Sequence, residues 1–214
     1  MKKIVRTTAT VVAACAFLLS GGVVAKGIKG DPVAGKEKSG LCAGCHGDDG
    51  NSAAADFPRL ASQYEDYIAK QIADFQKGHR ANNETMAGMA ATIATVQDAK
   101  DLGAYFNSQK MSKTPIAPVD KKLAAEGEVL FNEGNPRSGV YGCVNCHGKN
   151  GKGKSETISA FPVIGGQHKD YIIKELNDFR AGTRANDPGG MMSDIAKKLS
   201  DKEIEAVANY LSDQ

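Results

Sequence analysis

The chain has 214 residues, of which 41% are hydrophobic and 24% are charged. This composition is typical of a globular protein and excludes a disordered chain, while a formal net charge of +2 excludes a strongly basic nucleic-acid-binding protein. The length allows one or two domains, yet tryptophan is absent and aromatic residues make up only 6%, which is little for two cores built from side chains alone.

Residues 1–25 have the pattern of a secretory signal peptide. Three basic residues precede an apolar run over 11–19, and Ala25 ends a short segment suited to cleavage. The apolar run is shorter than the roughly 20 residues that a membrane span needs. We therefore predict an exported, periplasmic protein; the alternatives are a membrane anchor and lipidation at Cys15.

The first predicted helix, over Val33–Ser39, leads directly into a motif with chemical meaning. The motif reads Cys42-Ala43-Gly44-Cys45-His46, and C-x-x-C-H is the attachment signature of c-type haem. Each thiol can form a thioether with a haem vinyl group, and the adjacent His is then placed to bind the iron. A redox disulfide and half of a zinc site are the alternatives for such a cysteine pair.

Helices are predicted after this motif. Over Tyr64–Lys77 the apolar residues form one helical stripe that ends before Gly78. A further helix is marked by Val96, Leu102, Tyr105 and Phe106. A proline-containing stretch over 114–118 then predicts a semi-extended linker.

The second half repeats the first. A helix is predicted over Leu123–Phe131, and the haem motif returns as Cys143-Val144-Asn145-Cys146-His147. Residues 57–82 align with 161–186 without a gap, and 13 of the 26 positions are identical. The last helix begins at Ser200 with a capping box, and no alternating strand pattern of useful length is present.

Two repeats with helical periodicity predict an all-α protein of two tandem domains. The predicted division is a signal peptide over 1–25, an N-terminal domain over 26–113, a linker over 114–120 and a C-terminal domain over 121–214. Two motifs, each followed at once by His and with no other cysteine left after export, favour haem over zinc or a redox disulfide. We predict two covalently bound haem c groups, attached at Cys42, Cys45, Cys143 and Cys146 with His46 and His147 as iron ligands.

Methionines are the candidates for the second axial ligand of each iron. Met86 and Met89 follow the Arg-Ala-Asn segment of the first repeat, and Met191 and Met192 follow that of the second. Aligning the two segments as M-x-x-apolar-A-x-x-apolar pairs Met86 with Met192 and makes Met89 a core residue. Met86 and Met192 are therefore the predicted ligands; packing alone is the alternative, and Met191 stays open.

The remaining charged and titratable residues lead to weaker predictions. His79 and His168 are interpreted as surface or loop residues, and Arg80 and Arg184 as exposed loop arginines, with pairing to haem propionates as the alternative. The loops after the two motifs differ in charge, and we hypothesise that they dock different partners. The residues concerned are Asp48, Asp49 and Asp56 in the first repeat and Lys149, Lys152 and Lys154 in the second.

Together these features resemble the dihaem cytochrome c4 family, two class I cytochrome c domains fused in tandem. The resemblance rests on both C-x-x-C-H motifs, both Phe-Pro segments, both Arg-Ala-Asn loops with Met, and the terminal helices. It implies that the Pro58 and Pro162 carbonyls accept the Nδ1 protons of His46 and His147. It also implies lobes packed about a pseudo-twofold axis, with the haem propionates near their interface.

By this resemblance the protein is an electron carrier of the respiratory chain and not an enzyme. The implied partners are a quinol:cytochrome c reductase upstream and a haem–copper terminal oxidase downstream, with peripheral membrane association left open. One alternative is the dihaem cytochrome subunit of an oxidoreductase such as flavocytochrome c sulfide dehydrogenase. Another is a dihaem peroxidase or thiosulfate-oxidising enzyme, which would need one iron with an open distal site.

Overall fold

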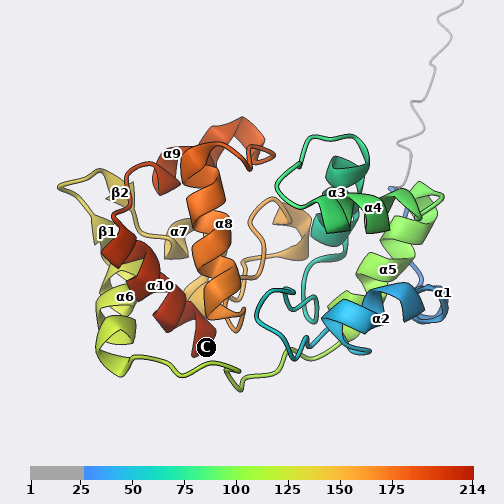
Figure 1. The fold of residues 1–214 in the computed structure, drawn as a ribbon, viewed down its shortest axis with the longest axis horizontal. Helices are drawn as coiled ribbons and strands as arrows, with labels where there is room; N and C mark the ends of the chain where they lie inside the picture. The colour runs from blue at the N-terminus through green and yellow to red at the C-terminus, as the bar shows by residue number, and fades with distance from the viewer. Residues whose placement is uncertain (1–26) are drawn as a thin grey trace, which may run out of the picture.

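A computed structural model describes residues 27–214, so the predicted signal peptide lies outside the described residues. The chain forms two helical lobes that lie side by side, and the segment connecting them runs along one edge of the molecule (Figure 1). The prediction of two tandem all-α domains is confirmed. Within residues 27–214, no helix is both long and apolar enough to cross a bilayer.

The first lobe contains five helices. They are α1 (Pro32–Lys38), α2 (Gly40–His46), α3 (Glu65–Gln76), α4 (Glu84–Ala91) and α5 (Val96–Ser108). Ile68 of α3 packs with Leu102, Tyr105 and Phe106 of α5 in the core. Of the four residues that predicted α5, Val96 is its first residue and is 64% exposed, so it is not part of this core.

The second lobe repeats this plan and adds a small hairpin. Its α-helices are α6 (Lys121–Glu133), α7 (Val144–His147), α8 (Lys169–Ala181), α9 (Met191–Ala196) and α10 (Asp201–Ser212). Its short elements are strands β1 (Gly134–Asn135) and β2 (Val140–Tyr141), which pair antiparallel, and the 3-10 turns Lys149–Gly151, Glu156–Ile158 and Pro188–Gly190. The predicted capping box at Ser200 is confirmed, with Glu203 as its other member.

In each lobe the first and last helices cross at close distance. A Cβ on Gly35 of α1 would lie 2.0 Å from the Asp101 carbonyl oxygen of α5, and a Cβ on Gly127 of α6 would lie 2.0 Å from the Ala206 carbonyl oxygen of α10. Only glycine permits this approach between helix backbones. The two crossings are equivalent, so both lobes hold their C-x-x-C-H motifs on the same arrangement of helices.

Two glutamines join the lobes at equivalent places. Gln63 donates to the Val163 carbonyl at 2.8 Å and accepts from the Val163 amide at 3.1 Å. Gln167 does the same with Arg59, at 2.9 and 2.8 Å. Because both side chains are buried, each satisfies two backbone groups of the other lobe that water cannot reach.

Candidate haem sites

The two haem motifs place their histidines in the same way. His46 ends α2 and His147 ends α7, and both rings are buried. The Nδ1 of His46 is 2.8 Å from the Pro58 carbonyl oxygen, and that of His147 is 2.9 Å from the Pro162 carbonyl oxygen. A carbonyl only accepts, so Nδ1 carries the proton and Nε2 presents its lone pair, which is the tautomer that binds iron.

Burial also sets the charge of these rings. It lowers the pKa of His46 and of His147, although each proline carbonyl acts in the opposite direction. Neutral imidazole is the form that binds a metal. Each ring is therefore oriented and kept uncharged by the polypeptide itself.

The thiols fit haem attachment better than the alternatives. All four are free, and burial raises the pKa of Cys42 and raises that of Cys143 to about 11. Redox-active C-x-x-C thiols have lowered pKa values instead. Within residues 27–214 no group of three or more His, Cys, Asp or Glu side chains is arranged to hold a metal ion.

The candidate methionines differ in exposure within each lobe. Met86 and Met192 are partly buried, whereas Met89 is 40% and Met191 is 42% exposed. The prediction that Met89 belongs to the core is therefore wrong. The register that pairs Met86 with Met192 also pairs Ala90 with Ala196, which are 2% and 0% exposed.

Polar side chains hold both methionine segments. Asn83 caps α4 by accepting from the Met86 amide at 2.9 Å. In the second lobe, Asp187 accepts from the Ser193 amide at 2.9 Å and from its hydroxyl at 3.0 Å. Met86 and Met192 thus lie in the first turn of a helix whose N-terminus is held by a side-chain hydrogen bond.

Two sequence predictions for side chains outside the motifs are wrong, and two are confirmed. Arg80 and Arg184 are buried at the lobe interface instead of exposed, and His168 is buried with its Nε2 3.1 Å from the Ser52 carbonyl oxygen. His79 is exposed and His168 lies in the loop directly before α8, as expected of surface or loop residues. The errors share one cause, because contact between the lobes covers segments that would be surface on an isolated domain.

The charged residues of the loops that follow the two C-x-x-C-H motifs are exposed, but one of the lysines is engaged by backbone groups. Asp48, Asp49 and Asp56 are exposed in the first lobe, as are Lys149 and Lys154 in the second. Lys152 is also exposed, but its Nζ donates to the Gly165 and Gln214 carbonyls at 3.2 and 2.9 Å. Lys149 and Lys154 are thus the lysines of this loop that are left to face a partner.

These features define a class of protein. Each lobe combines a cysteine pair for covalent attachment with a buried, oriented histidine, and the pattern occurs twice in one helical chain. This is the arrangement of a dihaem c-type cytochrome.

Comparisons with known proteins agree with this class and narrow it. The family model for cytochrome c matches residues 33–110 and 124–214. A cytochrome c4 of Thiocapsa roseopersicina is 46% identical over 183 residues, which is 85% of this chain and 92% of the relative. A thiosulfate dehydrogenase electron acceptor of Thiomonas intermedia is 36% identical over 81% of this chain and 78% of the relative.

Solved structures give the same result. The reduced recombinant cytochrome c4 from Pseudomonas stutzeri has a TM-score of 0.77 and 42% identity, covering 86% of this chain and 98% of that one. The chain belongs to the dihaem cytochrome c4 family. It is therefore a dihaem electron-transfer cytochrome with two covalently bound haem c groups.

Proposed function

We propose that this protein is a periplasmic electron carrier in which His46 and Met86 bind one iron and His147 and Met192 bind the other. The observation that carries the proposal is the equivalence of the two sites: each has a buried histidine held by a proline carbonyl and a partly buried methionine at a helix start. When bound, each haem supplies a one-electron couple. The polypeptide orients the ligands and keeps water away from them, so the protein does no proton chemistry and is not an enzyme.

The ligand assignment is tested by opening one site at a time. Carbon monoxide binds ferrous haem only where a coordination position is free, so the parent protein should bind none. Met86→Ala and Met192→Ala should each bind one equivalent. The matched controls Met89→Ala and Met191→Ala should bind none; the reverse pattern at either pair would move the ligand to the neighbouring methionine.

The proposed electron path runs from a quinol:cytochrome c reductase to a haem–copper terminal oxidase. It is tested by measuring reduction of the purified protein by the first complex and its oxidation by the second. Turnover with both at rates that depend on the concentration of the cytochrome supports the path. Failure to exchange electrons with either complex would contradict it.

A second candidate is the role of electron-accepting subunit to an oxidoreductase. A relative that acts as electron acceptor of thiosulfate dehydrogenase favours it, and a flavoprotein sulfide dehydrogenase would use the same kind of subunit. Purification from the native cells decides between the two roles. A stoichiometric, tightly bound dehydrogenase favours the subunit, and a free cytochrome favours the mobile carrier.

Export to the periplasm is the remaining part of the proposal. It depends on the signal sequence over residues 1–25 and predicts a mature protein that begins at Lys26. The intact mass of the haem-loaded protein tests this. Retention of residues 1–25 or a lipid on Cys15 would contradict it.

A further inference from the structure

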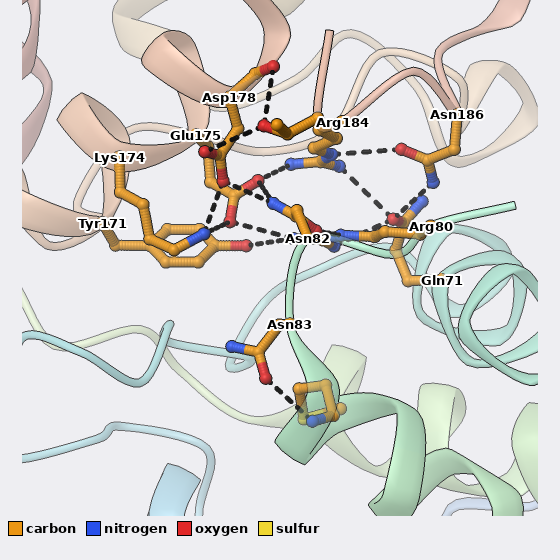
Figure 2. A network of polar contacts seen from close by, with 12 residues as sticks. Gln71, Arg80, Asn82, Asn83, Tyr171, Lys174, Glu175, Asp178, Arg184 and Asn186 are labelled. Atoms are coloured by element: carbon orange, nitrogen blue, oxygen red, sulfur yellow. Dashed lines mark hydrogen bonds and ion pairs between the residues drawn. The ribbon is translucent and has the colours of Figure 1, made fainter. Parts of the chain in front are cut away.

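The lobes contact each other through a polar network (Figure 2). Most of its contacts occur in two equivalent copies, one from each lobe. Arg80 of the first lobe donates to the Tyr171 hydroxyl at 3.1 Å, and Arg184 of the second donates to the Tyr67 hydroxyl at 3.0 Å. The backbones of the two arginines form an antiparallel bridge. Each guanidinium also lies over a phenylalanine of its own lobe, Phe75 or Phe179.

The asparagines of the network follow the same symmetry. Asn82 donates to Asp178 at 2.7 Å, and Asn186 donates to Asp74 at 2.6 Å. Each aspartate also forms an ion pair with the lysine four residues before it, Lys70 or Lys174. These lysine–aspartate pairs occur once in each lobe, so their charges favour neither lobe.

One pair of equivalent positions in this network carries different charges. Position 71 is glutamine in the first lobe, and its equivalent in the second lobe is Glu175. Gln71 accepts from Arg80 at 3.0 Å and from Arg184 at 3.3 Å. Glu175 contacts the same two guanidinia, at 3.1 Å and 2.7 Å, but with a carboxylate.

Glu175 is ionised in the folded protein. Its burial would raise the pKa of the carboxyl group, but Arg80 and Arg184, with a contribution from Lys174, outweigh this and hold that pKa below its ordinary value. Glu175 is only 6% exposed, and both arginines are 5% exposed. Solvent therefore screens this charge little, and a charge at low dielectric acts over long distances.

We propose that Glu175 is a positioning and tuning residue for electron transfer, which binds the two arginines across the interface and makes the electrostatic surroundings of the two haems unequal. A negative charge favours the ferric over the ferrous form of a haem, and it acts most on the nearer haem. Because positions 71 and 175 are equivalent in the repeat and contact the same two guanidinia, moving the carboxylate from position 175 to position 71 transfers it to the equivalent place in the other lobe. Its contribution to the difference between the two reduction potentials must then change sign.

Four proteins test this: the parent, Glu175→Gln, Gln71→Glu and the double variant Gln71→Glu/Glu175→Gln. Both potentials are measured in each by spectroelectrochemical titration. Glu175→Gln should raise both potentials, because a negative charge is removed. Gln71→Glu should lower both, because one is added.

The difference between the two potentials carries the decisive prediction. In the two single variants positions 71 and 175 are alike, so both should show the same difference. The double variant should depart from the parent by about twice that change, in the same direction. A purely structural role for Glu175 would alter stability without producing this pattern.

The inference depends on the two haems and not on which partner proteins the carrier serves. Haem content and the methionine–iron absorption band are recorded on the same samples, so a failure of the ligand proposal is recognised separately. If both irons are intact and the difference is the same in all four proteins, the inference is wrong. If Glu175→Gln does not fold, Gln71→Glu alone must still change the difference, and no change would overturn the inference.

Discussion

The two lobes share their internal frame and differ in where they place charge. Both have a glycine at the helix crossing and a proline carbonyl on the histidine. The helix that begins each lobe is also anchored alike at its N-terminus, but by different chemistry. In the first lobe the Asp31 amide donates to the buried Asp101 carboxylate, and in the second the Asp120 amide donates to the neutral Asn209 side chain, both at 2.9 Å.

This comparison distinguishes the features that both lobes need to bind a haem from the features that differ between the two lobes. Backbone approach and ligand orientation are the same in both lobes because they act directly at the motif. Two carboxylates stand at positions that are neutral in the other lobe. Asp101 lies at the helix crossing where the second lobe has Ala206, and Glu175 lies where the first lobe has Gln71. We infer that charge, more than shape, distinguishes the two sites.

The largest effect is expected at the helix crossings. Gly35→Ala or Gly127→Ala puts a methyl group against a backbone carbonyl of the partner helix, and overpacking of this kind costs about 3 kcal/mol of unfolding free energy. Each variant should destabilise its own lobe, as measured by thermal unfolding. Gly40→Ala, where a Cβ has no neighbour within 4 Å, is the control; equal loss in the control would contradict the comparison.

Removing either of the two glutamines that join the lobes, Gln63 and Gln167, here called the glutamine clamp, should have the next largest effect. Gln63→Ala leaves the buried amide and carbonyl of Val163 without partners, and Gln167→Ala does so for Arg59. Unsatisfied buried groups cost about 1–3 kcal/mol. Both variants should separate a single denaturant transition into two, and one transition of unchanged midpoint would show that the clamp does not couple the lobes.

Acid should destabilise the first lobe through Asp101. The Asp31 amide, with Lys38 and Gln97, lowers the pKa of Asp101 from 3.8 to about 2. Between these values the unfolded chain binds a proton that the folded chain does not, so stability falls as the pH drops through this window and is level below it. Asp101→Asn should remove this contribution in chemical denaturation series from pH 5 to about pH 2; an unchanged pH profile would contradict it.

The smallest effect is expected from the exposed lysines of the second lobe. Lys149→Glu together with Lys154→Glu should change the salt dependence of electron exchange with one partner and not the other. Lys152 is left in place because it binds backbone carbonyls. Exchange rates at low salt that match the parent with both partners would remove the hypothesis of distinct docking faces.

The sequence predicted the features that depend on short-range spacing. The cysteine pairs, their histidines, the repeat and the capping box at Ser200 are all local patterns. Arg80 and Arg184 were mispredicted as exposed because their burial depends on how the lobes meet, which no periodicity within one lobe encodes. A signal was nevertheless present, since Gln63, Arg80 and Asn82 recur identically in the second repeat, as polar residues on a symmetric interface would.

The hairpin of the second lobe was missed for a different reason. Its strands have two residues each, too few to establish an alternating pattern. Val140 points into the core and Tyr141 outward, at 3% and 76% exposure. A structure this short is fixed by its contacts with the rest of the lobe, including the bond from Asn135 to Glu203.

Magnetic circular dichroism of the oxidised protein, combined with its intact mass, tests the proposed sites most directly. We expect the mass of the polypeptide plus two haems and a spectrum of two low-spin irons, each bound by one histidine and one methionine. A mass with fewer haems, or an iron that lacks the methionine signature, would contradict the proposal that both lobes are closed electron-transfer sites.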